Sequence, residues 1–155
     1  MAVTGFWYTH AIATAFGEGA ATIDWVADSA SIKVALMQST FTGANQSQTA
    51  ADFWSDISAY EITASTNYTA NGKAIGTTTM TETAGSGKTV TFDAPDVVWS
   101  TATLTARGAA IIKDTGTDST SPVIAFLDFG ADVTATAGDF TITWHTDGIA
   151  TITVA

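Results

Sequence analysis

Residues 140–154, which read FTITWHTDGIATITV, alternate strictly between apolar and threonine side chains on both sides of an Asp-Gly turn signal. A period of two is typical of half-buried β-strands. A two-residue turn at Asp147-Gly148 would mix both kinds of side chain on one face, whereas a three-residue loop with Gly148 in the left-handed region separates them. We therefore predict a closing antiparallel hairpin that pairs Ile142 with Ile152 and has one apolar and one threonine face.

Threonine supplies 30 of the 155 residues, and threonine suits pleated, half-exposed strands better than helices. Further alternating runs lie at 31–39, 102–113 and 123–129, and the last is apolar on both faces, as in a central strand. A chain of this length favours a single core. The sequence predicts an all-β fold, an antiparallel β-sandwich or jelly-roll-like domain of eight to ten strands with one or two short helices.

The segments between these runs are less regular. We predict an edge strand at 22–26, a helical turn within 49–58 that Thr49 caps, a projecting hairpin at 77–92 and a link at 132–139. Alternation also predicts which side chains form the core. They are Val34, Leu36, Leu104, Ile112, Leu127, Ile142, Trp144 and Ile152.

Residues 1–19 differ in composition from the rest and are predicted to form an N-terminal arm with a short helix, followed by the β-sandwich domain at 20–155. The arm begins with three adjacent aromatic residues, which either cover the core of their own subunit or dock on a neighbouring one. Clustered aromatic side chains often anchor interfaces. The candidates for interface contacts are Phe6, Trp7 and Tyr8 in the arm, with Phe53 and Trp54 in the helical turn.

The net charge is −10 with only five Lys and Arg residues, so no basic stripe is available for nucleic acid or for an acidic membrane surface. The sequence has no cysteine, no apolar run of membrane-spanning length and no basic segment near Met1 of the kind that begins a signal peptide, so we expect a soluble product of the cytoplasm. Only 13% of residues are charged and the mean hydropathy is +0.23. This combination predicts a surface that is largely covered by partners.

No catalytic set stands out. The GSGKT run at 85–89 resembles part of a phosphate-binding loop but lacks the first glycine and is followed by a threonine-rich strand in place of a helix. His10 and His145 have no metal-ligand spacing. The loop acids are interpreted as solvated, with a hard cation as the alternative; they are Asp114, Asp118, Asp128, Asp132 and Asp139. We predict no enzymatic activity, no cofactor and no metal site.

Six short blocks carry a resemblance to a known class of proteins. They are SIKVALM at 31–37, ADFWSDI at 51–57, YTANG at 68–72, APDVVW at 94–99, LTAR at 104–107 and DFTITW at 139–144. With these blocks in this order, the chain resembles small virion proteins of tailed bacteriophages. The resemblance implies a structural component of the particle and supplies no catalytic residues.

Within that class we expect a capsid decoration (cement) protein that stabilises contacts between major capsid subunits, with the virion as its location. Its implied partners are the major capsid protein and copies of itself, in a trimer, the usual arrangement of decoration proteins. A tail, neck or fibre module that binds a host-surface glycan or protein is the alternative. The copy number per particle separates the two, because decoration needs hundreds of copies and a tail or neck only a few.

Overall fold

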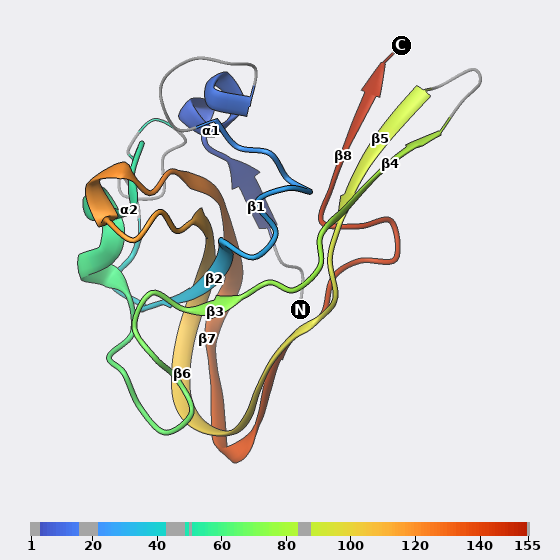
Figure 1. The fold of residues 1–155 in the computed structure, drawn as a ribbon. Coiled ribbons are helices and arrows are strands. Elements are labelled where there is room, and N and C mark those ends of the chain that lie inside the picture. Colours follow the sequence, from blue (N-terminus) through green and yellow to red (C-terminus); the bar gives the residue numbers. More distant parts are fainter. Residues whose placement is uncertain (1–3, 16–21, 43–48, 50, 84–87, 155) are drawn as a thin grey trace.

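The computed structural model describes residues 4–15, 22–42, 49, 51–83 and 88–154. These residues form two antiparallel β-sheets with two short α-helices, which confirms the predicted all-β class with short helices (Figure 1). The first sheet has five strands in the order β1-β7-β6-β2-β3, and the second has three in the order β4-β5-β8. The bounds of the strands are β1 Thr4–Trp7, β2 Ile32–Met37, β3 Lys73–Ala74, β4 Thr79–Thr83, β5 Lys88–Asp93, β6 Val97–Lys113, β7 Val123–Ile142 and β8 Ala150–Val154.

The two long strands, β6 and β7, pair with each other and form the centre of the five-stranded sheet. Their pairing runs from Val97 with Ile142 to Ile112 with Val123, and four register shifts interrupt it. β7 continues through residues 132–139, so the predicted link there is wrong. Threonine and alanine alternate over residues 134–137, which suits a strand, and the strand continues through Gly130 and Gly138.

The predicted closing hairpin is also wrong. Ile142 pairs with Val97 in the five-stranded sheet, while Ile152 pairs with Val90 in the three-stranded sheet. The two halves of the alternating run therefore belong to different sheets, although Gly148 adopts the expected positive φ of 89°. Alternation fixes which face of a strand is apolar, but it does not fix the neighbouring strand.

The three-stranded sheet projects from the body of the molecule beside β1 and α1 (Figure 1). Its β4 and β5 form the hairpin predicted at 77–92, with Thr81 opposite Thr91. The turn of this hairpin lies outside the described residues. Pairing between Thr91 and Thr151 joins β8 to the other side of β5.

Aromatic residues join the two sheets. The ring of Phe92 on β5 lies 5.4 Å from Trp7 and 5.9 Å from Trp25, centroid to centroid. The indole nitrogen of Trp25 donates to the backbone oxygen of Thr79 at 3.0 Å. Residues 22–26 form an irregular segment and a turn, so the predicted edge strand there is wrong. Trp25 anchors this segment by its side chain in place of a strand ladder.

The core lies around β2, β6 and β7, and most of the predicted core is confirmed. Five of the predicted residues are buried, namely Val34, Leu36, Leu104, Ile112 and Ile142. Leu127 and Trp144 are half-buried and pack against the core. Ile152 is 49% exposed, so its assignment to the core is wrong because β8 lies in the projecting sheet.

The two helices lie near one end of the five-stranded sheet. α1 spans Thr9–Ala15 and confirms the helix predicted in the arm, and α2 spans Trp54–Ile57. Thr49 does not cap α2: the carboxylate of Asp56 accepts the backbone N–H groups of Asp52 and Phe53 at 3.0 and 2.9 Å. The described residues also include two short 3₁₀ turns, at Ser58–Tyr60 and Asp118–Thr120.

Candidate functional site

A strong bend in β7 creates a concave site. The ring centroids of Phe129 and Phe140 are 6.1 Å apart, although the two residues belong to one strand. Eleven residues of straight strand would span about 36 Å. β7 therefore folds back toward itself, and β6 bends with it through their pairing (Figure 1). Thr101 and Ala137, which lie near this bend, both have positive φ angles, of 54° and 49°.

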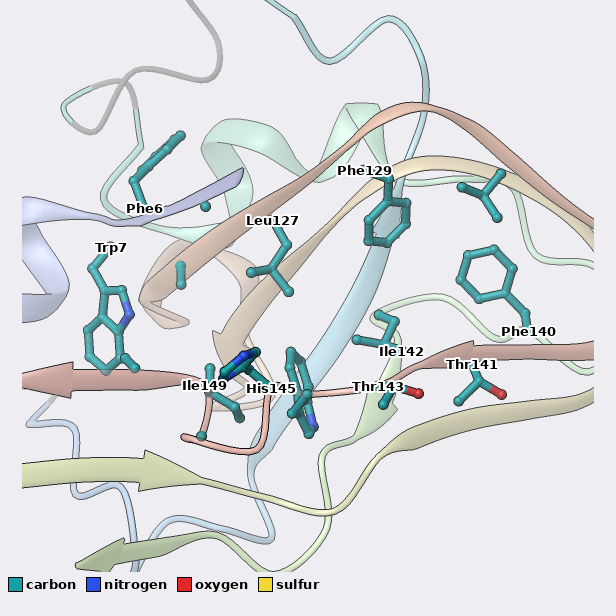
Figure 2. Close-up of a pocket in the computed structure, with 16 residues that line it drawn as sticks. Phe6, Trp7, Leu127, Phe129, Phe140, Thr141, Ile142, Thr143, His145 and Ile149 are labelled. Carbon is teal, nitrogen blue, oxygen red and sulfur yellow. The ribbon is translucent and has the colours of Figure 1, made fainter. Parts of the chain in front are cut away.

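The groove between the two arms of the bend has a volume of about 790 Å³. β7 contributes Leu127 and Phe129 from one arm and Ile142 from the other, while β1 closes one side and the connection to β8 closes another (Figure 2). The side chain of Val133, 36% exposed, lies at the outer part of β7 that lines the groove. The site is thus built mainly from strand side chains whose positions the ladder fixes.

Two glycines allow the floor of the groove to form. Gly5 on β1 lies opposite Leu127, and a β-carbon at Gly5 would lie 2.9 Å from the backbone oxygen of Phe126. Gly108 on β6 lies opposite Asp128, and a β-carbon there would lie 2.5 Å from the backbone oxygen of Leu127. β7 therefore passes between two neighbours that approach closely because they lack side chains.

The connection between β7 and β8 forms another wall of the groove. Trp144 holds it in place: its backbone N–H donates to the carboxylate of Asp96 at 3.1 Å, and its indole nitrogen donates to the backbone oxygen of Pro95 at 2.8 Å. The backbone N–H of Ile149 donates to the oxygen of Phe92 at 2.8 Å. A β-carbon at Gly148 would lie 2.6 Å from that same oxygen, so the close approach again requires glycine.

The groove is lined mainly by uncharged side chains. None of the described residues that line it is Asp, Glu, Lys or Arg, although the chain carries a net charge of −10. The lining contains two threonines, Thr141 and Thr143, and one histidine, His145, whose side chain is 74% exposed. Such a surface suits an apolar chain segment and offers no cluster of acids or bases to a charged ligand.

The predicted interface residues occupy different environments. Tyr8 and Trp54 are fully buried in their own subunit, at 0% and 1% exposed, so their side chains present no surface to a partner in this structure. Phe6 and Trp7 are half-buried and line the groove. Phe53 is half-buried, and its ring lies 5.0 Å from that of His10 at the other end of the sheet.

The residues with potential chemistry are dispersed. Among the described residues, no group of three or more His, Cys, Asp or Glu side chains is placed to hold a metal ion. The carboxylate of Asp114 accepts a hydrogen bond from Lys33, which lowers the pKa of Asp114. The guanidinium of Arg107 donates to Asp128 at 2.9 Å and lowers the pKa of that carboxyl in the same way. These acids stabilise the sheet by local pairing.

Residues 85–87 of the GSGKT run lie outside the described residues, and Thr89 lies in β5, the strand expected there in place of a helix. His10 contacts Phe53, and His145 lies in a turn where its Nδ1 accepts the backbone N–H of Asp147 at 3.1 Å. The two histidines therefore belong to separate parts of the described structure.

The sequence predicted Leu127, Ile142 and Trp144 as core residues and Phe6 and Trp7 as interface contacts, but it did not predict the groove that they line. A signal was present, because Gly130 and Gly138 interrupt a strand-like pattern, and glycine within a strand often marks a sharp bend. Comparisons with protein-family models, curated proteins and solved structures found no match. In the part of the chain that the structure describes, no helix has the length and apolar character needed to span a bilayer.

Proposed function

We propose that this protein is a structural component of a bacteriophage virion, a capsid decoration protein that stabilises contacts between major capsid subunits and associates with copies of itself. The observation that carries the proposal is the open groove of about 790 Å³ without Asp, Glu, Lys or Arg among its described lining residues. The resemblance of the six sequence blocks to virion proteins is the reason for proposing a role in the particle. The groove provides a surface for attachment to the capsid.

In this role the groove binds an apolar segment of the major capsid protein. Trp7 and Ile149 flank the opening, and Leu127 forms part of the floor (Figure 2). Burial of apolar area is the main favourable term in such contacts, and aromatic side chains contribute large areas. An apolar attachment site is also consistent with a chain of net charge −10, because the contact does not depend on opposite charge.

The binding of purified protein to expanded capsids tests this role. Val133→Lys places a charge at the groove, and Thr136→Lys places the same charge at an exposed position three residues further along β7. We expect Val133→Lys to weaken capsid binding by about tenfold or more, which corresponds to about 1.4 kcal/mol, and Thr136→Lys to leave it nearly unchanged. Equal binding by both variants and the wild type would argue against the groove as the attachment site.

The number of copies in the particle tests the assignment itself. Quantitative mass spectrometry of purified virions, or a cryo-EM map, should find hundreds of copies on the capsid surface. A handful of copies at the tail or neck would instead support the module that binds a host-surface glycan or protein. Absence of the protein from virions would exclude both forms of the proposal.

A further inference from the structure

The three-stranded sheet has two faces of opposite character. On one face, threonine side chains line up across the strands, with Thr81, Thr91 and Thr151 in one row. Thr89 and Thr153 are paired in the next row, with their hydroxyl oxygens 3.5 Å apart. Hydroxyls of this kind are readily solvated, so this face is suited to contact with water.

The other face is apolar. Met80 lies opposite Phe92, and Phe92 lies opposite Ala150; in the next row Val90 lies opposite Ile152. Met80 is 55% exposed and Ile152 is 49% exposed, whereas Phe92 is half-buried against Trp7 and Trp25 at the base of the sheet. We call Met80, Val90, Phe92 and Ile152 the apolar face. The same strands supply threonine at most of the neighbouring positions, so the difference between the faces follows the alternation of the strands, as in a sheet covered on one side.

The distribution of charge indicates which partner covers the apolar face. Copies of a chain with net charge −10 repel one another wherever their carboxylates approach. Among the described side chains of β4, β5 and β8, one charged group, Glu82, lies on the same side of the sheet as the apolar face, so repulsion between copies is small here. A basic partner would find no cluster of acids on this face. A second copy presents an apolar surface of the same width and length.

We propose that two copies of this chain associate by packing the apolar faces of their three-stranded sheets against each other, with the threonine faces directed outward. Paired sheets pack about 10 Å apart and interdigitate their side chains, which Met80 and Ile152 are exposed enough to do. The contact is isologous and forms a pair, in place of the trimer that the resemblance implies. The inference deepens the proposed assembly role by naming the surface through which copies meet.

Sedimentation equilibrium of the purified full-length protein tests the contact with two matched double variants. Met80→Lys with Ile152→Lys adds two charges to the apolar face, and Thr81→Lys with Thr151→Lys adds them to the adjacent positions on the threonine face. We expect a dimer for the wild type at micromolar concentration and for the threonine-face variant. The apolar-face variant should dissociate at least tenfold more readily.

A milder pair of substitutions keeps the test independent of folding. Met80→Thr with Ile152→Thr gives the apolar face the residue type of the opposite face, and threonine retains a high preference for strands. This variant should also be monomeric, with an unchanged far-ultraviolet circular dichroism spectrum. Added salt should strengthen wild-type association, because it screens repulsion between acidic copies, whereas an interface of ion pairs would weaken.

A thiol probe locates the contact directly, since the chain contains no cysteine. At concentrations that favour the dimer, a polar maleimide should modify the thiol of Ile152→Cys several-fold more slowly than the thiol of Thr151→Cys. After dilution to the monomer, the two thiols should react at similar rates.

A monomeric or trimeric wild type would overturn the inference, as would a dimer that persists in the apolar-face and Met80→Thr/Ile152→Thr variants. Capsid binding by a monomeric wild type would leave the proposed function standing while removing this contact. A wild-type dimer that does not bind capsids would support this contact and argue against the proposed function.

Discussion

Substitution of Gly108 by alanine tests whether close contact between β6 and β7 shapes the molecule. Gly108 has no positive φ angle, so an alanine there meets no conformational barrier of its own. Its β-carbon would lie 2.5 Å from the backbone oxygen of Leu127 and 2.7 Å from the ring of Phe126. The first distance is 0.9 Å below the 3.4 Å at which ordinary contact begins, since 3.4 − 2.5 = 0.9. The atom that must move belongs to the backbone of β7, beneath the groove.

The size of the effect follows from two opposing terms. Overpacking of a well-packed site costs about 1–3 kcal/mol. Replacement of glycine by alanine offsets about 0.5–1 kcal/mol of this, because the unfolded chain loses conformational freedom. We therefore expect Gly108→Ala to lower the free energy of unfolding by about 1–2 kcal/mol. For a domain of this size that corresponds to a decrease in Tm of about 2–8 °C.

Thermal and urea unfolding followed by circular dichroism measure this change, and two other glycines serve as controls. Gly138 also lies in the β6–β7 pairing, but the nearest atom to a β-carbon there is 3.7 Å away, so Gly138→Ala should be neutral or slightly stabilising. Gly116 has open space but a φ of 84°, so Gly116→Ala reports conformational strain alone, about 1 kcal/mol. Wild-type stability in Gly108→Ala, or equal losses at Gly108 and Gly138, would refute the steric explanation.

Two further predictions concern buried polar contacts. Burial raises the pKa of Glu61 above its ordinary value of 4.5, although Tyr68 and the backbone of Gly72 donate hydrogen bonds to it. Between pH 4.5 and the raised pKa the folded state thus binds more protons than the unfolded state, so the free energy of unfolding falls as pH rises through that window. Glu61→Gln should abolish this fall in urea titrations across the acidic range. A pH profile unchanged by the substitution would contradict this assignment to Glu61. Asp56→Ala should cost about 1 kcal/mol, because two backbone N–H groups at the start of α2 lose their acceptor. In the same unfolding assay Asp56→Asn, which keeps a side-chain oxygen, should lose less, and equal losses would show that charge and not hydrogen bonding is the cause.

The candidate groove illustrates why some of the site was predictable and some was not. Alternation around Leu127 and Ile142 correctly predicted apolar inward-facing side chains, because the pleat of a strand places every second residue on the same side. The fold of β7 back toward itself brings Phe129 within 6.1 Å of Phe140, and no local pattern specifies the angle of that bend. Gly138 marks the region but does not determine its direction.

The aromatic residues near the N-terminus show a similar division. Their composition predicted large apolar contacts, and the structure buries Tyr8 while leaving Phe6 and Trp7 at the groove. Which of the three faced inward depended on the pairing of β1 with β7, a contact between segments more than 100 residues apart. The interface role of these residues stays a prediction.

The sequence by itself determined that this chain forms strands, which side of most strands is apolar, and that Gly148 occupies a turn, because these properties depend on neighbouring residues. Only the tertiary structure decided that residues 140–142 and 150–154 enter separate sheets, with Ile142 buried beside Val97 and Ile152 exposed beside Val90. The physical reason is that a strand offers the same backbone hydrogen bonds to any partner. Its partner is therefore chosen by long-range packing and by the bend of β7, both of which depend on the whole fold.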